Sequence, residues 1–493
     1  MKKIIIICIL KISLSNTVYS QGQDAIWYFG DSAGISFAGG NTNSISNGKC
    51  YSSEASSTVC DHQGNLLFYT GFNFYDNLYI WNKNHQIMAG SGNIASLDYT
   101  STFTQGLLIC SMPGDSNKYY LFTEYHHTIT GPPYFDLNCQ IIDMSLDSGR
   151  GAVISANINL CTNCILSEKM QVVRHANGRD WWLMLIEFPD LANGVPSYFI
   201  SRLITPNGID SATTQSIGPG FDGYGQLIFS PEGNQIIVAD ESRGLNLYNF
   251  DRCTGMLSNW TELGYPPYLN SVSNGFYGCS FSPSGRYIYA SREDSVFQYD
   301  VLAPDVKASR VFLAKTGHIG QYWLGQHKLG PDGKIYIANF DYNGGATLGL
   351  DKFLNVINYP DSAGLACGLS LYSFSLGDRR SLAGMPNIPN YNLGAVVGSV
   401  CDSLTGIYEM SEKNKILVYP NPAGNEITIS NLQKYKLMEI KLYNVEGTLI
   451  MFQRPNDEAV SRLNVQHIHN GIYFYSITDI SGLVQRGKIC ILH

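Results

Sequence analysis

The sequence predicts an all-β protein, in which a β-propeller of about seven blades is followed by a small Ig-like β-sandwich. Three observations support this fold class. The composition favours turns and aromatic-rich strands, with 49 Gly, 32 Tyr and 22 Phe among 493 residues. One turn-and-strand pattern recurs along most of the chain, and a different series of short strands fills residues 415–493.

Residues 1–20 are expected to be a cleaved export signal. Lys2 and Lys3 precede the short apolar run 4–10, and Val18 and Ser20 occupy the small-residue positions of a cleavage site. The rest of the sequence contains no stretch of apolar residues long enough to cross a bilayer, so no transmembrane span is expected.

The charge of the chain argues against two classes of partner. Residues 21–414 carry 21 basic and 34 acidic residues, a net charge of −13, whereas the whole chain has −8. Nucleic acids and anionic membranes attract basic surfaces, so neither is expected as a partner.

The chain has twelve cysteines, and export makes disulfides plausible. Cys50 with Cys60, and Cys161 with Cys164, are near enough in sequence to suggest local bridges. Spacing alone does not give the connectivity. Cys490 is the candidate for an unpaired thiol.

A Pro-x-Gly turn between two strands is the repeated unit. Proline presets φ and glycine supplies a positive φ, so the chain reverses direction. The clearest copies are FSPEGNQIIVAD (229–240), FSPSGRYIYASR (281–292) and LGPDGKIYIANF (329–340), with weaker copies at 59–70, 110–123 and 172–185. The turn glycines lie at 64, 114, 178, 233, 285 and 333, and further strands follow at 78–84, 245–251 and 296–300. A mean spacing of about 54 residues is that of a propeller blade with several strands.

Residues 21–393 are therefore assigned to the propeller, and their length corresponds to about seven blades. We expect the strand AIWYFG (25–30) and the late strand LSLYSFSLG (369–377) to share one blade. That arrangement would close the ring and remove the free sheet edges.

Five stretches of the propeller region carry a resemblance to a known group of proteins. They are WYFGDSAGISF (27–37), GNLLFYTG (64–71), LYIWNKNHQIM (78–88), SEKMQVVRHANGRDWWLM (167–184) and GPDGKIYIA (330–338). In this order they resemble exported WD-repeat-like β-propeller proteins of Bacteroidetes-type bacteria, which lack the Trp-Asp dipeptide, as this chain does. The resemblance implies the fold and brings no established activity.

A new pattern begins after the propeller. Residues 394–414 contain no repeat unit and scattered Gly and Ser, which is typical of a linker. Residues 415–493 then show short alternating strands, as expected for a small β-sandwich. Pro420 and Pro422 exclude the opening segment from a central ladder position, so they mark the edge where the domain begins.

Four motifs mark this terminal domain. They are Tyr419-Pro420-Asn421-Pro422, Leu442-Tyr443-Asn444-Val445-Glu446-Gly447, Gly471-Ile472-Tyr473 and a basic-then-apolar end around Lys488. In this order they resemble the type A C-terminal sorting domain of the type IX secretion system. The resemblance implies recognition by the type IX machinery, transit across the outer membrane, removal of the domain, and either attachment to a surface lipopolysaccharide or release.

Signals for catalytic or metal chemistry are weak. GPGFDGYG (218–225) satisfies G-x-G-x-x-G, but its proline and the strand that follows favour a loop between blades. Cys161-x-x-Cys164 is half a zinc site without a second pair, so a structural disulfide is favoured. No D-x-D-x-D-G calcium loop occurs. We therefore assign no cofactor, metal or catalytic residue, and calcium in a rim loop has no motif to support it.

Acidic residues and histidines leave one alternative open. Glu124, His126 and His127 could supply ligands or an acid/base pair, although a loop or solvent-face position is favoured. Other acids near strand ends could face one rim as a carboxyl pair, although turn and surface roles are favoured; they lie at 222, 240, 241, 293, 294, 332 and 341.

The expected function is binding. Trp260 is the aromatic residue expected to be exposed and is the candidate ligand contact. We expect an exported propeller that binds a glycan, peptide or protein partner through loops on one rim or through the central channel. The alternative is a hydrolase or lyase acting on glycans or peptides, which would require convergent acids or a His/Asp set with shifted pKa values around the channel.

Overall fold

The computed structural model of the chain is built almost entirely from β-strands and forms two compact units, Met1–Asp402 and Ser403–His493. The structure describes residues 22–75, 77–94, 102–126, 135–164, 166–188, 197–221, 224–264, 275–317, 322–341, 348–402, 416–431, 437–444, 447–454, 460–479 and 482–493. The expected export signal lies outside these residues.

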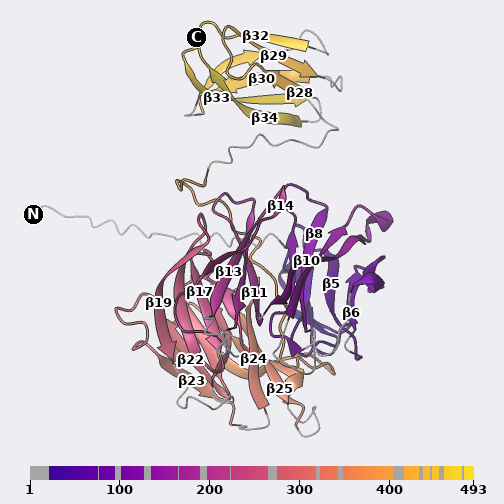
Figure 1. The fold of residues 1–493 in the computed structure, drawn as a ribbon, viewed down its shortest axis with the longest axis vertical. Helices are drawn as coiled ribbons and strands as arrows, with labels where there is room; N and C mark the ends of the chain where they lie inside the picture. Colours follow the sequence, from indigo (N-terminus) through magenta and orange to yellow (C-terminus); the bar gives the residue numbers. More distant parts are fainter. Residues whose placement is uncertain are drawn as a thin grey trace, which may run out of the picture. The chain divides into compact units, whose positions relative to one another are not determined.

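In the described part of the first unit, seven antiparallel sheets follow one another along the chain (Figure 1). Their first strands are β1 (Ile26–Phe29), β4 (Ser57–Cys60), β7 (Leu107–Ser111), β11 (Leu166–Arg174), β16 (Leu227–Phe229), β20 (Phe276–Phe281) and β24 (Tyr322–Leu329). The second strands are β2 (Ala33–Ser36), β5 (Leu66–Phe72), β8 (Lys118–His126), β12 (Trp181–Glu187), β17 (Gln235–Asp240), β21 (Tyr287–Arg292) and β25 (Ile335–Asp341).

The outer strands complete each sheet. The third strands are β3 (Asn43–Ile45), β6 (Leu78–Asn82), β9 (Phe135–Asp143), β13 (Tyr198–Thr205), β18 (Gly244–Asp251), β22 (Ser295–Asp300) and β26 (Phe353–Ile357). Further strands are β10 (Ala152–Cys164), β14 (Gly208–Ile209), β15 (Thr213–Gln215), β19 (Met256–Gly264), β23 (Val311–Lys315) and β27 (Leu369–Ser375). Short 3₁₀ turns lie at η1 (Ala38–Gly40), η2 (Ser91–Asn93), η4 (Asp147–Gly149), η5 (Leu350–Lys352) and η6 (Gly364–Cys367).

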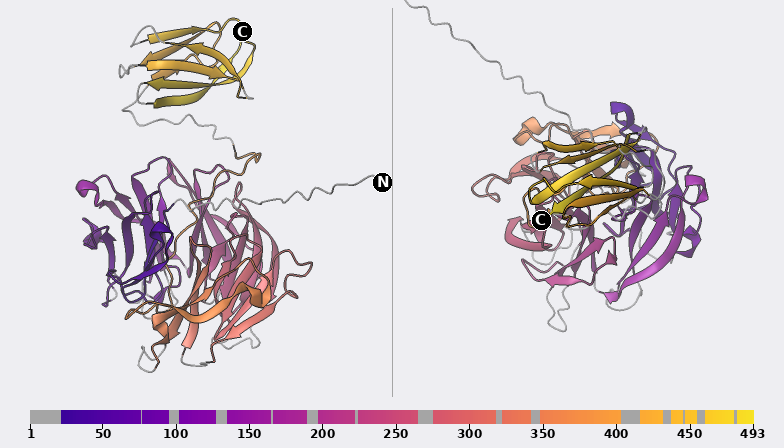
Figure 2. Two further views of the ribbon diagram at one scale, coloured as in Figure 1. Left: turned by 180° about the vertical axis from the view of Figure 1, so that it is seen from behind. Right: turned by 90° about the horizontal axis from the view of Figure 1, so that it is seen from above.

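The first strand of each sheet lies at the centre of the unit. β1 contacts β4, β4 contacts β7, and the same relation continues through β11, β16 and β20 to β24. Sheets that meet through their first strands are arranged around a common axis, as the ribbon views show (Figures 1 and 2). The structure thus confirms a β-propeller, and the seven sheets of the described residues agree with the expected number of blades.

The turn chemistry predicted from the repeats is present. Gly233, Gly285 and Gly333 have φ values of 72°, 73° and 76°. Each of their amides donates to the carbonyl oxygen three residues earlier, at 2.8, 2.9 and 2.9 Å. Glycine adopts this left-handed conformation without steric cost, so the repeated Pro-x-Gly sequence joins the first and second strands of these blades.

The ring closes in a different way from the one expected. β1 pairs with β2 and β27 pairs with β26, so the two strands belong to separate sheets. β1 needs no strand from the end of the propeller, because β2 and β3 extend its own sheet. Other contacts close the ring: the rings of Trp27 and Phe37 in the first blade each lie 5.8 Å from the Tyr336 ring of the seventh, centroid to centroid. The Asp31 amide donates to the Arg380 carbonyl at 2.9 Å. Arg380 also forms an ion pair with Asp31 at 3.2 Å.

After the last blade the chain turns inward and runs along the inner strands. We call residues 381–391 the axial segment, which belongs to the orange trace between the sheets in Figure 1. Its residues 381–389 are all buried. The Ala383 amide donates to the Ser53 carbonyl at 3.0 Å, and the Ala383 carbonyl accepts from the Gln326 amide at 2.9 Å. The segment therefore joins the second and seventh blades.

Asn387 anchors the middle of the axial segment. Its side-chain amide donates to the Met170 carbonyl at 3.0 Å and accepts from the Gln171 side chain at 2.8 Å. Its backbone carbonyl accepts from the Ser57 hydroxyl at 2.7 Å. Farther on, the Tyr391 hydroxyl donates to a backbone carbonyl of β7 at 3.0 Å. The central channel, expected as one route for a ligand, thus contains the chain's own residues.

Two glutamines link the inner strands of different blades, and a third holds the axial segment. The Gln105 side chain donates to the Leu227 carbonyl at 3.1 Å and accepts from the Leu227 amide at 2.7 Å. The Gln226 side chain makes the same pair of bonds with His327, at 3.2 and 2.8 Å. Gln326 accepts from an amide of the axial segment at 2.9 Å. These bonds satisfy backbone groups that would otherwise be unpaired in a buried position.

The start of the expected linker also packs on the propeller. The Val396 amide donates to the Ala176 carbonyl at 2.8 Å, and Cys401 is joined to Cys253 by a disulfide. Residues 394–402 are therefore held in the first unit, because both hydrogen bonds and a covalent link fix them there.

The second unit is a small β-sandwich, as predicted. One sheet has the order β28 (Ile416–Tyr419), β29 (Glu426–Asn431), β32 (Val460–Asn464). The other has the order β31 (Leu449–Gln453), β30 (Leu437–Tyr443), β33 (Gly471–Asp479), β34 (Gly482–Ile491). Its core consists mainly of aliphatic side chains, among them Ile427, Ile440, Leu463, Ile477 and Ile491.

Candidate functional site

Four glutamates from four different blades interact near one end of the inner strands. Glu54 precedes β4, Glu124 lies in β8, Glu168 lies in β11 and Glu241 follows β17. The charge of Glu168 acts on both Glu54 and Glu124, and the charge of Glu241 acts on both Glu54 and Glu168. Together with Tyr277 of β20 we call these residues the axial carboxyl cluster.

Hydrogen bonds fix two members of the cluster. The Tyr277 hydroxyl donates to Oε2 of Glu54 at 2.6 Å. The Thr104 amide and hydroxyl both donate to Oε2 of Glu168, at 3.1 and 3.3 Å. Glu168 has a φ of 59°, a left-handed conformation that is unusual for a residue with a Cβ. Such strained residues gather at functional sites, where the surrounding structure holds them.

Burial dominates the electrostatics of the cluster. It raises the pKa of Glu124 to about 8, with the charge of Glu168 as the second cause. It raises the pKa of Glu168 to about 7 and that of Glu241 to about 7. Burial and then the charge of Glu168 hold the pKa of Glu54 well above its usual range. The pKa values of Glu124, Glu168 and Glu241 therefore lie close to neutral pH, unlike those of carboxyl groups in water.

The cation beside the cluster is engaged elsewhere. Lys169 forms an ion pair with Asp240 at 3.0 Å, and both side chains are fully buried. Asp240 also accepts from the amides of Ser242 and Arg243, at 2.9 and 2.8 Å. The charge of Lys169 lowers the pKa values of Glu124, Glu168 and Glu241, but by less than burial raises them.

Glu124 is the deepest acid of the cluster. Its side chain is 2% exposed, and neither carboxyl oxygen has a hydrogen-bond partner among the residues that the structure describes. The sequence favoured a loop or solvent-face position for Glu124, and that expectation is wrong. Glu124 lies in β8, and its buried side chain is close enough to Glu168 to feel the charge of that carboxyl group. Such an unsatisfied buried carboxyl is costly, so it points to a role other than stability.

The cluster is open to solvent on one side. Glu54, Glu241 and Tyr277 are partly exposed, and Tyr224 is 49% exposed. Besides burial, the charges of Glu168, Glu241 and Glu54 raise the pKa of Tyr224, which places its phenol near all three. This opening would let a ligand reach the carboxyl groups. None of the described residues forms a group of three His, Cys, Asp or Glu side chains spaced to hold a metal ion.

A separate cavity of 390 Å³ lies farther along the same inner strands. It is lined by the turn prolines Pro231, Pro283 and Pro331 and by Lys328, among others. Burial lowers the pKa of Lys328 to about 8, and its ammonium donates to the Ile388 carbonyl of the axial segment. The Lys328 ammonium thus serves the axial segment.

The expected disulfides are present only in part. Cys161 and Cys164 are joined, within β10. Cys50 and Cys60 are both free and buried, so the suggested bridge between them is not formed. Cys50 packs in an aromatic cluster with Tyr28, Tyr69 and Trp81, whereas Cys60 is in β4. Cys490 is a free thiol of the second unit.

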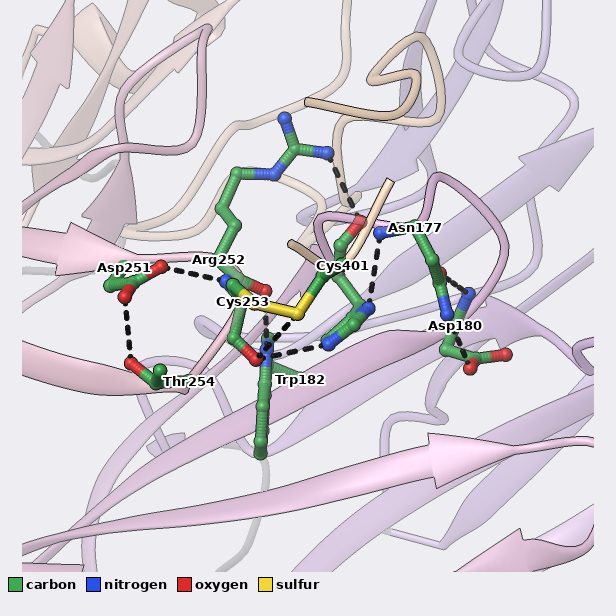
Figure 3. Close-up of a disulfide and its surroundings, with 9 residues drawn as sticks. Asn177, Asp180, Trp182, Asp251, Arg252, Cys253, Thr254 and Cys401 are labelled. Carbon is green, nitrogen blue, oxygen red and sulfur yellow. Dashed lines mark hydrogen bonds between the residues drawn. A yellow bond between two sulfur atoms is a disulfide. The ribbon is translucent and has the colours of Figure 1, made fainter. Parts of the chain in front are cut away.

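Sequence spacing did not indicate the second disulfide, between Cys253 and Cys401, which are 148 residues apart (Figure 3). The Cys253 backbone amide donates to the Asp251 carboxylate at 2.8 Å. The guanidinium of Arg252 donates to the Gly394 carbonyl, and the Trp182 indole donates to the Arg252 carbonyl at 2.8 Å. The bridge therefore fastens the end of the first unit to a rigid turn between β18 and β19.

Trp260, the predicted ligand contact, is 45% exposed. It lies in the outer strand β19 rather than in a loop, and its indole donates to the Asn246 side chain at 2.9 Å. Neither Asn246 nor Gly218, which also adjoins the ring, belongs to the axial carboxyl cluster. A contact of Trp260 with a ligand stays a prediction.

The sorting-motif residues have structural roles in the sandwich. Leu442 and Tyr473 are buried in its core, and the Tyr473 hydroxyl donates to the His469 carbonyl at 2.8 Å. The Asn444 side chain accepts from the Thr448 amide at 2.8 Å, which closes the turn that contains Gly447. The motif residues Tyr419, Pro420, Pro422, Gly471 and Ile472 are at least partly exposed.

Asn421 ties the opening motif to the last strand. Its side chain accepts from the Cys490 amide at 2.9 Å and donates to the Lys488 carbonyl at 3.4 Å. The Lys488 side chain is exposed. The first and last motifs of the domain are therefore adjacent in the folded unit.

Several solved structures are distantly similar to the chain. The Pseudomonas aeruginosa periplasmic gluconolactonase PpgL is 12% identical with a TM-score of 0.39, over 84% of this chain and 94% of that one. A putative 6-phosphogluconolactonase from Bacteroides uniformis is 10% identical with a TM-score of 0.37, over 88% and 98%. Kluyveromyces lactis Hsv2 is 10% identical with a TM-score of 0.36, over 70% and 93%. Such values carry no information on function. No curated protein matches the sequence.

The terminal domain has a clear match. Residues 417–491 match the family model of the secretion system C-terminal sorting domain. Among the described residues, no helix is long and apolar enough to cross a membrane. Residues 417–491 are a sorting domain, and the chain is thus a type IX cargo that reaches the cell surface or is secreted.

Proposed function

We propose that the exported propeller binds an extracellular glycan, peptide or protein at the axial carboxyl cluster. The observation that carries this proposal is the convergence of Glu54, Glu124, Glu168 and Glu241 from four blades. Carboxyl groups that share protons near neutral pH both donate and accept hydrogen bonds, so they suit a ligand with several polar groups.

A ligand screen by thermal shift on the full-length protein tests the proposal. The probes are glycan and peptide panels at pH 7, and a ligand at 100 times its Kd should stabilise the fold by about 2.7 kcal/mol. Tyr224→Ala and Glu241→Gln should abolish the shift, because both residues border the opening of the cluster. Glu232→Gln is the matched control, an exposed glutamate in the turn between β16 and β17. A shift that survives both cluster variants would place the ligand elsewhere.

The alternative is a hydrolase or lyase acting on glycans or peptides. The pKa values of about 7 for Glu168 and Glu241 favour it, because a general acid or base works best with a pKa near the working pH. Chromatography of each hit after incubation with the protein separates the two functions. New products that disappear in Glu168→Gln would establish the enzyme, and an intact ligand would support binding alone.

A further inference from the structure

The axial carboxyl cluster carries negative charge that the described residues do not compensate. No ion pair joins Glu54, Glu124, Glu168 or Glu241 to a basic side chain of the described part of the chain. Lys169 is the basic residue that influences three of these acids, and it is ion-paired with Asp240. Removing a carboxylate from water without a partner is costly, so the cluster either holds protons or receives a cation.

The spacing of the acids selects the kind of cation. A metal ion needs several ligand atoms within about 2.0–2.6 Å. The described residues contain no group of three acidic, His or Cys side chains with such spacing. An organic cation is larger and is held by hydrogen bonds and charge at longer range.

Aromatic side chains add a second attraction for an organic cation. The Tyr277 hydroxyl donates to Glu54 at 2.6 Å, and Tyr224 lies beside Glu241, whose amide donates to the Tyr224 carbonyl at 3.1 Å. A cation beside a tyrosine ring is attracted by the negative face of the ring. Carboxylates beside tyrosines are a suitable set for an ammonium group, which has three donors.

We propose that the axial carboxyl cluster binds an ammonium group of the ligand between Glu54, Glu168 and Glu241. The ammonium group can come from a lysine side chain or from an amino sugar, and both present the same charged nitrogen. This inference rests on the proposed function, because it names the chemistry that the same site recognises. Glu124, which is 2% exposed, has a pKa of about 8 and is therefore mostly protonated at pH 7, so the negative charge of the site comes from the other acids.

Binding of a lysine ammonium group, which stays protonated over this range, should become tighter as the pH rises from 6 to 8. The acids must lose their protons to attract an ammonium group, and those of Glu168 and Glu241 do so around pH 7. The other titratable or charged groups that face them are Glu54, Glu124, Tyr224, Asp240 and Lys169. A carboxyl group with a pKa near 7 is about tenfold more ionised at pH 8 than at pH 6, so the affinity should rise about tenfold for each such group that the ligand needs.

Isothermal titration of the full-length protein with two pairs of probes tests the inference. One pair is tetralysine and its fully Nε-acetylated form; the other is the glucosamine tetramer and the N-acetylglucosamine tetramer. We expect at least one charged probe to bind and its acetylated partner to bind at least tenfold more weakly. The affinity for tetralysine should rise with pH, whereas the glucosamine tetramer loses its own charge over the same range and is compared with its acetylated partner at pH 6. Glu54→Gln and Glu241→Gln should each weaken binding at least tenfold, whereas Glu232→Gln should not change it. Melting temperatures of the variants show that they are folded.

The outcomes separate this inference from the proposed function. Which charged probe binds assigns the ammonium group to a peptide or to a glycan. Equal binding of an acetylated probe and its charged partner, lost in the two cluster variants, would overturn the inference and keep the proposed function. If the charged probes bind the two cluster variants with the same affinity as the wild type, both the inference and the proposed function are overturned. The same holds if none of the four probes and no member of the wider panels binds.

Discussion

Replacing Glu124 by glutamine should stabilise the propeller at neutral and alkaline pH. Burial and the charge of Glu168 raise the pKa of Glu124 from its ordinary value of 4.5 to about 8. The folded state therefore holds this proton more tightly than the unfolded state. The resulting stability is complete below pH 4.5 and is lost as the pH rises through 8.

The size of the effect follows from the two pKa values. A displacement from 4.5 to about 8 corresponds to up to about 5 kcal/mol of stability lost by the wild type at high pH. Glu124→Gln keeps the shape and polarity of the protonated acid but cannot ionise. The variant should match the wild type at pH 4 and exceed it by up to about 5 kcal/mol at pH 9.

Urea unfolding followed by tryptophan fluorescence, from pH 4 to pH 9, measures this difference. All six tryptophans lie between residues 27 and 323, so the signal reports the propeller and not the sorting domain. Glu232→Gln, in an exposed turn, should differ from the wild type by the same small amount at every pH. If Glu124→Gln shows the pH dependence of the wild type, or is the less stable protein at pH 9, the burial and charge assigned to Glu124 are refuted.

Three further changes test the rest of the structure. Cys401→Ser should lower the free energy of unfolding in urea by about 4–5 kcal/mol, because the lost bridge spans 148 residues. Cys490→Ser, which replaces a free thiol, should have no effect. Gly384→Ala should lower the free energy of unfolding by about 1–3 kcal/mol, because the new Cβ would lie 2.2 Å from the Glu54 carbonyl oxygen. Gly394→Ala is the control, because no atom lies within 4 Å of its Cβ. Equal effects of the two substitutions would contradict the packing of the axial segment. Deleting residues 417–491 should leave the protein in the periplasm, as seen by cell fractionation and immunoblotting, and a deleted chain that still reaches the surface would disprove the sorting role.

The repeats predicted most of the architecture because local chemistry determines a blade. A Pro-x-Gly turn needs glycine at a positive φ, and the strand that follows needs β-branched and aromatic residues. Both signals lie within about a dozen residues, so they can be read from one sequence. The strand that closes the ring was predicted wrongly, because which sheet receives a terminal strand depends on pairing between distant segments.

The axial segment and the axial carboxyl cluster left no comparable signal. Residues 381–391 have no periodic pattern, because their backbone bonds go to several blades instead of to one neighbouring strand. Glu54, Glu124, Glu168 and Glu241 are spread over almost 190 residues of the sequence, and only the circular arrangement of the blades brings them together. The bridge from Cys253 to Cys401 was missed for the same reason.

Hydrogen–deuterium exchange of the free and ligand-bound protein tests the central claim most directly. The ligand is whichever of tetralysine, the glucosamine tetramer and the N-acetylglucosamine tetramer stabilises the wild type. The account predicts slower exchange at the start of β4, β11 and β20 and in the turn after β17, where the axial carboxyl cluster lies. Slower exchange confined to the outer strand β19 around Trp260, or to the cavity beside Lys328, would contradict it.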